Sequence, residues 1–329
     1  MKVKKFLIIQ TASIGDVILS TPLIEKIHHF FGDARIDFLL KKGNEKLFAG
    51  HPFLTDVLIW DKRDKKYRNL LDLVNYVRDQ KYDYVINVQR FASSGFITAL
   101  SGAKHTVGFT KNPFSLFFSK RIKHRINAGI HETDRNLKLI EHLTGEGAFS
   151  MKLYPSQRDF AAVSQFKTRQ YLCVAPASLW FTKQYPKDKW IEFIDEREDE
   201  QIYLIGGQED KKLCNEIIEQ SRNEKCLNLA GKLSLLQTAA LMKDAKMNFT
   251  NDSAPMHLAS AMNANIAAVF CSTVPEFGFG PKSSGSHVVQ TDVELKCKPC
   301  GLHGYNECPE GHFKCALTIN KKQLANCIE

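Results

Sequence analysis

Short apolar runs alternate with segments of helical periodicity along most of the chain. In the first half, runs typical of buried strands lie at 5–10, 35–40, 56–60 and 83–88, with helical segments at about 16–30, 43–50 and 67–80. Residues 131–144 place Leu137, Ile140 and Leu143 on one helical face, and glycines at 145 and 147 end that helix. This alternation predicts parallel strands covered by helices on both faces.

The alternation stops at residues 145–168, which have weak periodicity and predict a connector, and then restarts. Further strands are predicted at 171–176, 201–207, 226–230, 246–250 and 265–271, again with helices between them. The restart predicts an α/β protein with two doubly wound domains, 1–155 and 156–316, and a short final helix at 317–329. Such sheets bind ligands at the carboxyl ends of their strands, so we expect a site in a cleft between two facing domains.

Composition favours a cytoplasmic protein. No run of about 18 apolar residues is present, and the apolar part of the first ten residues is too short for a signal peptide. The nine cysteines are an odd number scattered through a long chain, which indicates a reducing compartment.

The net charge of +9 lies entirely in the first half of the chain. Residues 1–150 hold 24 Lys and Arg against 15 Asp and Glu, whereas residues 151–329 hold 21 of each. Basic runs at 62–68 and 120–125 contribute much of the excess. This asymmetry indicates that the first half faces an anionic partner such as nucleic acid, a phosphorylated lipid or a membrane surface, although solvated basic faces would look the same.

The first strand ends in a polar turn, Q-T-A-S-I-G-D at 10–16, that opens a helix at Asp16. This carboxylate either complements the helix dipole or acts as a general base toward a substrate hydroxyl. Neither G-x-G-x-x-G nor G-x-x-x-x-G-K-[ST] occurs in the chain, which disfavours a dinucleotide fingerprint and a P-loop.

Three strand ends of the second half carry further polar residues. Thr182 and Lys183 lie in a loop after the strand at 171–176, where the lysine is suited to neutralise a phosphate. Glu209 follows the strand at 201–207. In Rossmann-type folds, an acidic residue beyond a strand can bind the hydroxyls of a ribose. The stretch T-N-D-S-A-P-M-H at 250–257 opens a helix after another strand.

Helix N-termini bind anions through free N–H groups, so those of Ser253, Ala254 and Met256 are predicted to hold a diphosphate. His257 is interpreted as a packed helix residue or a group behind the site. No D-x-D occurs in the chain, which favours an anion site without a metal.

Several stretches together resemble the ADP-heptose:lipopolysaccharide heptosyltransferases, glycosyltransferase family nine. They cover about the whole chain in the correct order: G-D-V-I-L-S-T-P (15–22), Q-R-F-A-S-S-G (89–95), K-Q-Y-P-K-D-K-W (183–190), L-A-G-K-L-S-L (229–235) and T-N-D-S-A-P-M-H-L-A-S-A (250–261). The resemblance implies a GT-B fold, with the acceptor on the first Rossmann-like domain and the nucleotide sugar on the second. It also implies that the final helix crosses back to the first domain.

The resemblance further implies residue roles in an inverting, metal-independent transfer of heptose. Asp16 would be the base that deprotonates the acceptor hydroxyl, and Lys183, Thr182 and the helix start at 253–257 would stabilise the departing diphosphate. Glu209 would contact the donor's ribose, and Asp252 the donor sugar. Acceptor phosphates or acidic sugars would meet Ser13, Arg90 and Lys111. No catalytic metal or other cofactor is expected.

Two residues depart from the family pattern, and the resemblance implies no metal role for one cluster of cysteines. Ala254 stands where glycine is usual, and Tyr185 where tryptophan is usual. A methyl group at position 254 would crowd the diphosphate. The cluster is a C-x-x-C followed by a loose second pair, formed by Cys297, Cys300, Cys308 and Cys315. This spacing suits either a structural zinc site or plain buried thiols.

The expected partners are a nucleotide-sugar donor, an anionic lipid A–core acceptor and the inner face of the inner membrane as a peripheral contact. A transferase that uses another nucleotide sugar and a sugar-nucleotide epimerase stay open as alternatives. Nucleic acid is not expected as a partner, because RNP-like aromatic motifs and regular finger spacing are missing.

Overall fold

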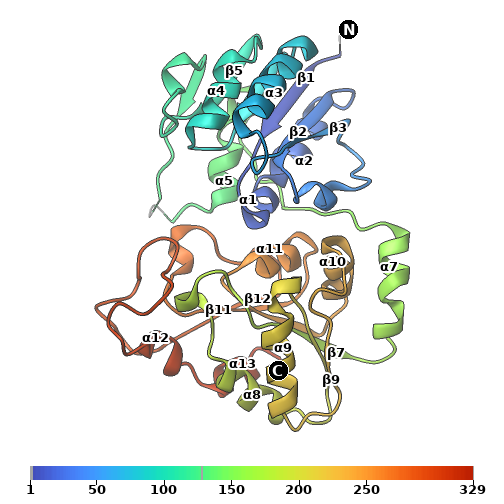
Figure 1. Cartoon of the computed structure of the whole chain (residues 1–329), viewed down its shortest axis with the longest axis vertical. Coiled ribbons are helices and arrows are strands. Elements are labelled where there is room, and N and C mark those ends of the chain that lie inside the picture. Colours follow the sequence, from blue (N-terminus) through green and yellow to red (C-terminus); the bar gives the residue numbers. More distant parts are fainter. Residues whose placement is uncertain (1–2, 127–128, 329) are drawn as a thin grey trace. The chain divides into compact units, whose positions relative to one another are not determined.

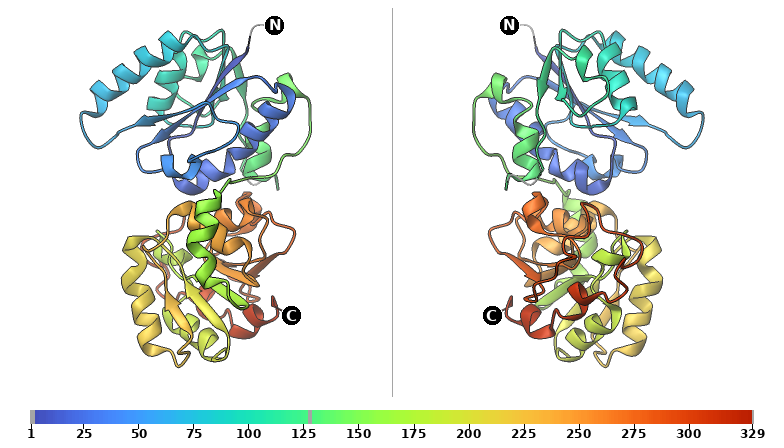
Figure 2. Two further views of the ribbon diagram at one scale, coloured as in Figure 1. Left: turned by 90° about the vertical axis from the view of Figure 1, so that its right-hand side faces the viewer. Right: turned by 90° about the vertical axis from the view of Figure 1, so that its left-hand side faces the viewer.

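The computed structural model describes residues 3–126 and 129–328, and the chain divides into two compact units, residues 1–154 and 155–329 (Figure 1). Each unit contains one six-stranded sheet with helices on both faces (Figure 2). None of the described helices combines the length and the apolar character needed to cross a membrane.

The sheet of the first unit is parallel throughout. Its strands are β1 (Lys5–Ile9), β2 (Arg35–Lys41), β3 (Asp56–Trp60), β4 (Tyr84–Asn87), β5 (His105–Phe109) and β6 (Lys120–Ile122). They lie in the order β3-β2-β1-β4-β5-β6. The order reverses between β1 and β4, and doubly wound sheets bind ligands at such a reversal.

Side chains of β1 alternate between the two helical layers, as the pleat of a strand requires. Leu7 clusters with Leu70 and Val74 of α3, whereas Phe6 packs against Phe31 after α2 in a tilted arrangement, with ring centroids 5.3 Å apart. The helices of this unit are α1 (Ile14–Leu19), α2 (Thr21–Phe30), α3 (Lys66–Gln80), α4 (Ala92–Leu100), α5 (Glu132–Leu137) and α6 (Glu141–Thr144).

The second unit repeats this topology. Its strands are β7 (Tyr171–Ala175), β8 (Gln201–Leu204), β9 (Cys226–Asn228), β10 (Met247–Asn251), β11 (Ile266–Phe270) and β12 (Ser286–Gln290), and all neighbouring pairs are parallel. The order β12-β11-β10-β7-β8-β9 reverses between β7 and β10. The predicted α/β class with two doubly wound sheets is confirmed.

Helices of the second unit pack on a large core. They are α7 (Gln157–Val163), α8 (Lys187–Asp195), α9 (Lys211–Gln220), α10 (Leu235–Lys243), α11 (Ala254–Ala261), α12 (Lys314–Leu317) and α13 (Lys321–Ala325). Tyr185 and Trp190 are buried in this core edge to face, so the tyrosine that departs from the family pattern is a packing residue. Helix α13 packs against α8 and adds Leu324 to the same core, so this final segment lies with the second unit.

Some predicted elements differ from the observed ones for identifiable reasons. Strands β5, β6 and β12 were not predicted, because β6 and β12 are edge strands with few buried side chains and β5 contains a histidine and a glycine. Residues 43–50 contain only a short 3-10 turn, Glu45–Phe48, and the predicted helix at 131–144 is two helices. The predicted connector contains α7, and this helix begins with a capping box formed by Ser156 and Asp159.

Candidate active site

The carboxyl edge of each sheet collects the polar residues singled out in the sequence. In the first unit, the loops after β1 and β4 meet at the reversal of strand order, and in the second unit the loops after β7 and β10 do so. Asp16 follows β1 and Arg90 follows β4, whereas Lys183 follows β7 and Asp252 follows β10. Each unit therefore presents its candidate residues where its fold favours a ligand.

Asp16 and Ser13 form a capping box at the start of α1. The Ser13 hydroxyl and backbone N–H both donate to Asp16 Oδ2, at 2.5 and 3.2 Å, and the Asp16 N–H donates back to the hydroxyl at 3.4 Å. Asp16 is half-buried and Ser13 is exposed. The structure thus brings the predicted base together with one predicted acceptor residue, and the carboxylate also has the structural role that the cap requires.

The other two predicted acceptor residues are exposed cations on neighbouring loops. Arg90 follows β4, with its guanidinium 5.5 Å from the centre of the Phe91 ring, and Lys111 follows β5. Asn112 ties the two loops together, because its Nδ2 donates to the carbonyls of Gln89 and Phe91 at 3.0 Å each. Both positive charges therefore lie at the carboxyl edge of the sheet, open to an anionic ligand.

Buried amides between β1 and β4 were missed by the sequence analysis. Gln89 Nε2 donates to Gln10 Oε1, and Asn87 Oδ1 accepts the Gln89 N–H at 2.8 Å. Within the described part of the chain, Asn87 Nδ2 and Gln89 Oε1 are buried without a hydrogen-bond partner. Their position directly at the end of a buried strand was the available signal. Unsatisfied buried groups at a reversal point are suited to a ligand.

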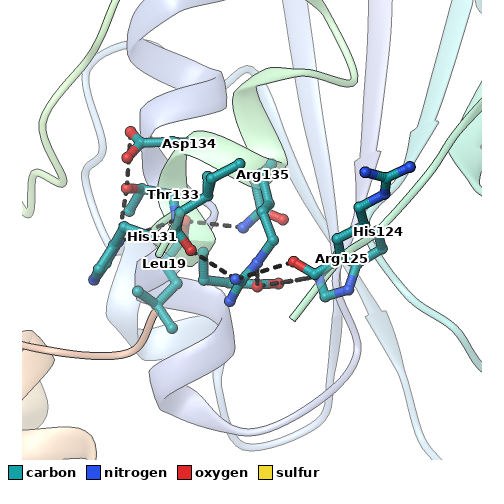
Figure 3. Close-up of polar contacts among 10 residues, drawn as sticks. Leu19, His124, Arg125, His131, Thr133, Asp134 and Arg135 are labelled. Carbon is teal, nitrogen blue, oxygen red and sulfur yellow. Dashed lines mark hydrogen bonds and ion pairs between the residues drawn. The ribbon is translucent and has the colours of Figure 1, made fainter. Parts of the chain in front are cut away.

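A polar network around α5, which sequence reasoning also missed, joins this helix to the segment before it and to α1 (Figure 3). Arg135 Nε and His124 Nε2 lie 2.5 and 3.0 Å from Glu132 Oε2. Burial by itself would raise the pKa of Glu132, but hydrogen bonding and charge from His124 and Arg135 outweigh it and lower the pKa. Asn136 Nδ2 donates to the Leu19 carbonyl at the end of α1 (3.1 Å). Asn136 therefore ties α5, which the ion pairs hold in place, to the short helix that carries Asp16.

In the second unit, Lys183 and Asp252 form a nearly buried ion pair. Lys183 Nζ lies 2.6 Å from Asp252 Oδ2, and their side chains are 15% and 8% exposed. Thr273, after β11, donates its hydroxyl to the same carboxylate oxygen at 2.6 Å. The structure thus joins two predicted donor residues directly and adds Thr273, which the sequence analysis did not single out.

Thr182 is buried, and its hydroxyl is engaged inside the protein. Thr182 Oγ1 accepts from the Ser272 hydroxyl at 3.0 Å and from the Tyr305 N–H at 2.8 Å. The residue as a whole is only 1% exposed. The direct donor contact expected of Thr182 therefore stays a prediction, whereas its contacts to two other segments are present.

The start of α11 combines half-buried and buried residues. Ser253 and Ala254 are half-buried at the helix mouth, whereas Met256 and His257 are buried. The Met256 N–H already donates to the Ser253 carbonyl at 3.1 Å, and Pro255 has no N–H, so a ligand at this helix mouth would meet the N–H groups of Ser253 and Ala254. Asn251 fixes this turn, since its amide donates to the Pro176 carbonyl and accepts from the Tyr185 N–H at 2.8 and 2.9 Å.

Glu209 is exposed in a 3-10 turn, Gln208–Asp210, after β8. Its carboxylate lies close to Gly207, where an added Cβ would be 2.6 Å from its oxygens. The neighbouring Asp210 accepts the Gly207 N–H at 2.8 Å, and burial raises the pKa of Asp210. Glu209 is thus the predicted donor residue most open to solvent.

The cysteine cluster consists of free thiols in the structure. Cys300 donates its S–H to the Cys297 carbonyl at 3.1 Å, Cys297 Sγ lies 3.8 Å from His312 Nε2, and Cys308 Sγ accepts the Phe313 N–H at 3.4 Å. Cys315 is buried. Over residues 3–126 and 129–328, no three His, Cys, Asp or Glu side chains are arranged to hold a metal ion. The zinc interpretation of the four cysteines stays a prediction.

Comparison with known proteins places the chain in a family. A sequence model of glycosyltransferase family 9 (heptosyltransferase) matches residues 70–306, and the chain belongs to that family. It is 25% identical over 279 residues to lipopolysaccharide heptosyltransferase 3 of Escherichia coli, covering 79% of this chain and 81% of that protein.

Two solved structures resemble the chain over nearly its full length. E. coli ADP-heptose lipopolysaccharide heptosyltransferase II gives a TM-score of 0.80 at 20% identity, over 98% of both chains. A glycosyltransferase family 9 protein of Veillonella parvula gives 0.84 at 20% identity, over 99% of this chain and 97% of that one. The resemblance predicted from the sequence, the GT-B fold class and the assignment as a glycosyltransferase are confirmed.

Proposed function

We propose that the protein transfers heptose from ADP-heptose to an anionic lipopolysaccharide inner-core acceptor, with inversion at the anomeric carbon and without a catalytic metal. The first unit would hold the acceptor and the second unit the donor. The observation that carries the donor half is the Lys183–Asp252 pair beside the mouth of α11, at the reversal point of the second sheet. The curated and solved relatives named for heptose transfer support the choice of sugar.

In the proposed reaction, Asp16 accepts the proton of an acceptor hydroxyl as that oxygen attacks the anomeric carbon. The bond from this carbon to the diphosphate breaks on the opposite side, so ADP leaves and the configuration inverts. Lys183 and the N–H groups at the start of α11 stabilise the charge that develops on the leaving diphosphate. The chain has no D-x-D pair of the kind that holds a metal against a diphosphate. We therefore propose that these groups stabilise the diphosphate without a metal.

The remaining donor roles follow from position. Glu209 is proposed to bind the ribose, because it is exposed at the end of β8 next to β7. Asp252 holds Lys183 in the unloaded site and turns to the donor sugar when the diphosphate takes over the lysine. Thr182 supports this pair from behind. Ala254 lies where its methyl group meets the diphosphate and sets how closely the donor approaches the helix.

The excess of positive charge in the first half supports an anionic acceptor. Ser13, Arg90 and Lys111 are proposed to bind its phosphates or acidic sugars. An acceptor anchored by lipid A places the reaction in the cytoplasm, at the inner face of the inner membrane, with peripheral contact through basic surfaces.

The test measures ADP release from ADP-heptose with and without a lipid A–inner-core acceptor, in buffer with EDTA. We expect release only when both substrates are present, no loss with EDTA, and an inverted anomeric configuration by NMR of the product. Turnover of the donor without an acceptor would instead indicate an epimerase. If another nucleotide sugar, but not ADP-heptose, stabilises the protein against heat in a saturable way, that nucleotide sugar would be the donor instead.

A further inference from the structure

Thr182 connects three segments of the second unit that are far apart in sequence. It precedes Lys183 directly, and its hydroxyl accepts hydrogen bonds from Ser272 after β11 and from the backbone of Tyr305. The Thr182 N–H in turn donates to the Tyr305 carbonyl at 3.1 Å. Two reciprocal hydrogen bonds therefore fix the loop around Tyr305 to the residue that sets the position of Lys183.

The loop of residues 300–305, here called the strap, is attached at both ends. The Cys300 N–H donates to the Ser272 carbonyl at 2.8 Å, and Tyr305 pairs with Thr182 as described. Just beyond the strap, the rings of Phe313 and Phe181 stack with their centroids 5.0 Å apart. The strap thus spans from the end of β11 to the turn that carries Thr182 and Lys183.

Gly304 shows how closely the strap fits this turn. Its φ is +79°, and a Cβ added there would lie 2.9 Å from Thr182 Oγ1, 3.2 Å from Lys183 Cγ and 3.4 Å from Trp180 Cβ. Gly311 has nearly the same backbone conformation, with φ +66°, but an added Cβ would meet no atom within 4 Å. The two glycines therefore differ in contact with the turn and not in backbone conformation.

The strap also reaches the ion pair through a closed ring made of two hydrogen bonds, one ion pair and two pairs of chain neighbours. Ser272 donates to Thr182, and its neighbour Thr273 donates to Asp252 Oδ2, which pairs with Lys183 Nζ at 2.6 Å. Lys183 follows Thr182 in the chain, which closes the ring. A lysine ammonium on a flexible four-carbon stem loses rotamer freedom when it binds an anion, and a stem that is already held loses less.

We propose that Thr182 and the strap are positioning elements that hold the Lys183 ammonium beside Asp252, ready for a diphosphate. This rests on the proposed function, because it takes Lys183 as a ligand of the donor diphosphate. Thr182 then acts through Lys183 without touching the donor itself.

The test measures the dissociation constant of ADP by calorimetry in buffer with EDTA, using matched glycine variants. Gly304→Ala is expected to weaken ADP binding about tenfold, as displacement of the turn costs one or two hydrogen bonds. Gly311→Ala carries the same backbone strain and is expected to leave the constant within about twofold. Equal ADP affinity of the two variants would overturn the proposal.

A second set of variants separates positioning from general stability. Thr182→Val should weaken ADP binding about tenfold, and Thr182→Ser should restore it, because the hydroxyl is retained. In a Lys183→Met background, Thr182→Val should have no further effect, since the group it positions is gone. An additive loss in that background would show that Thr182 does not act through Lys183.

These results separate the two hypotheses. Failure of the wild-type protein to bind ADP would contradict the proposed function. Normal ADP binding by the wild type together with unchanged binding by Gly304→Ala and Thr182→Val would contradict the strap alone. Circular dichroism establishes which variants fold. If Gly304→Ala does not fold, ADP binding by Thr182→Val and Thr182→Ser decides whether the proposal about the strap holds.

Discussion

The two units share one topology but hold their polar groups in opposite ways. Both sheets reverse strand order between the first and fourth strands of the unit, and both present candidate residues at the carboxyl edge. In the first unit these are exposed or half-buried groups, such as Arg90 and Asp16, in a half of the chain with charge +9. In the second unit Lys183, Asp252 and Thr182 are locked in a closed ring of contacts in a neutral half.

Under the proposed function, this difference lets one scaffold supply two kinds of binding. Exposed cations attract a large anionic ligand over a distance, although salt screens them. A buried ion pair gives little net stability, but it fixes the position of a charge that a small, well-defined group must meet. A lipid-linked acceptor suits the first arrangement, and the diphosphate of a nucleotide suits the second.

The largest effect is expected at the candidate base. Asp16→Asn removes the proton acceptor but keeps an oxygen that can accept the Ser13 N–H, so the helix cap survives. Transfer should fall by a factor on the order of 10³, with ADP binding by the second unit unchanged. Turnover assays and ADP calorimetry on the same preparation check this. Near-normal turnover would mean that the aspartate serves only as a cap.

A smaller loss is expected at the buried pair of the second unit. Lys183→Met should lower transfer on the order of 10²-fold and weaken ADP binding, because one donor to the leaving diphosphate is removed. The matched control is Lys187→Met, which breaks a more exposed pair with Glu216 (3.2 Å) and should change neither quantity. A similar loss in both variants would mean that overall charge, and not the position of Lys183, matters.

The same variant also separates stability from function. Lys183→Met leaves the Asp252 carboxylate buried without its cation, so the second unit should be destabilised. Adding Asp252→Asn should restore the melting temperature but not ADP binding. Recovery of binding in the double variant would exclude a direct role for the lysine.

The smallest effect concerns the stability of the first unit and leaves the chemistry unchanged. Burial, with a smaller contribution from His28, lowers the pKa of His51 from 6.5 to about 4. Between these values the unfolded chain binds a proton that the folded chain does not, so stability falls as the pH drops through this window. At pH 5 the loss is about 2 kcal/mol.

His51→Asn tests this assignment. His51 Nδ1 accepts the Phe53 N–H at 3.2 Å, and the asparagine oxygen can accept it without titrating. Hydrogen exchange of the first-unit core at pH 7 and pH 5 should show a smaller pH dependence in the variant than in the wild type. Comparing the two proteins cancels the contributions of other groups, such as Glu25, whose pKa burial raises. Equal pH dependence would assign the acid sensitivity elsewhere.

Much of the fold could be predicted because buried strands leave a strong apolar signal. The runs at 5–10, 35–40 and 171–176 correspond to strands buried on both faces. Edge strands such as β6 and β12 bury little and leave a weak signal. The helix at 157–163 was not predicted because it buries little apolar surface, and only its capping box indicates where it begins.

The candidate site was predictable as residue types at strand ends, but not as contacts. Asp16, Lys183 and Asp252 each follow a predicted strand, and the rule for parallel sheets places such residues at one edge. The sequence analysis treated Thr182 as a ligand residue and 297–315 only as a cysteine cluster. Their connection through Tyr305 spans more than a hundred residues, and local patterns contain no information about such a pairing.

The sequence by itself determined the class of fold, the uneven charge and the family to which the chain belongs, since these depend on local periodicity, composition and ordered motifs. Only the tertiary structure decided which polar groups distant in sequence meet: Lys183 with Asp252, Thr273 with Asp252, and Thr182 with the strap. The physical reason is that burial removes water as a partner, so each polar group must find another one in space. Which group that is depends on how distant segments pack.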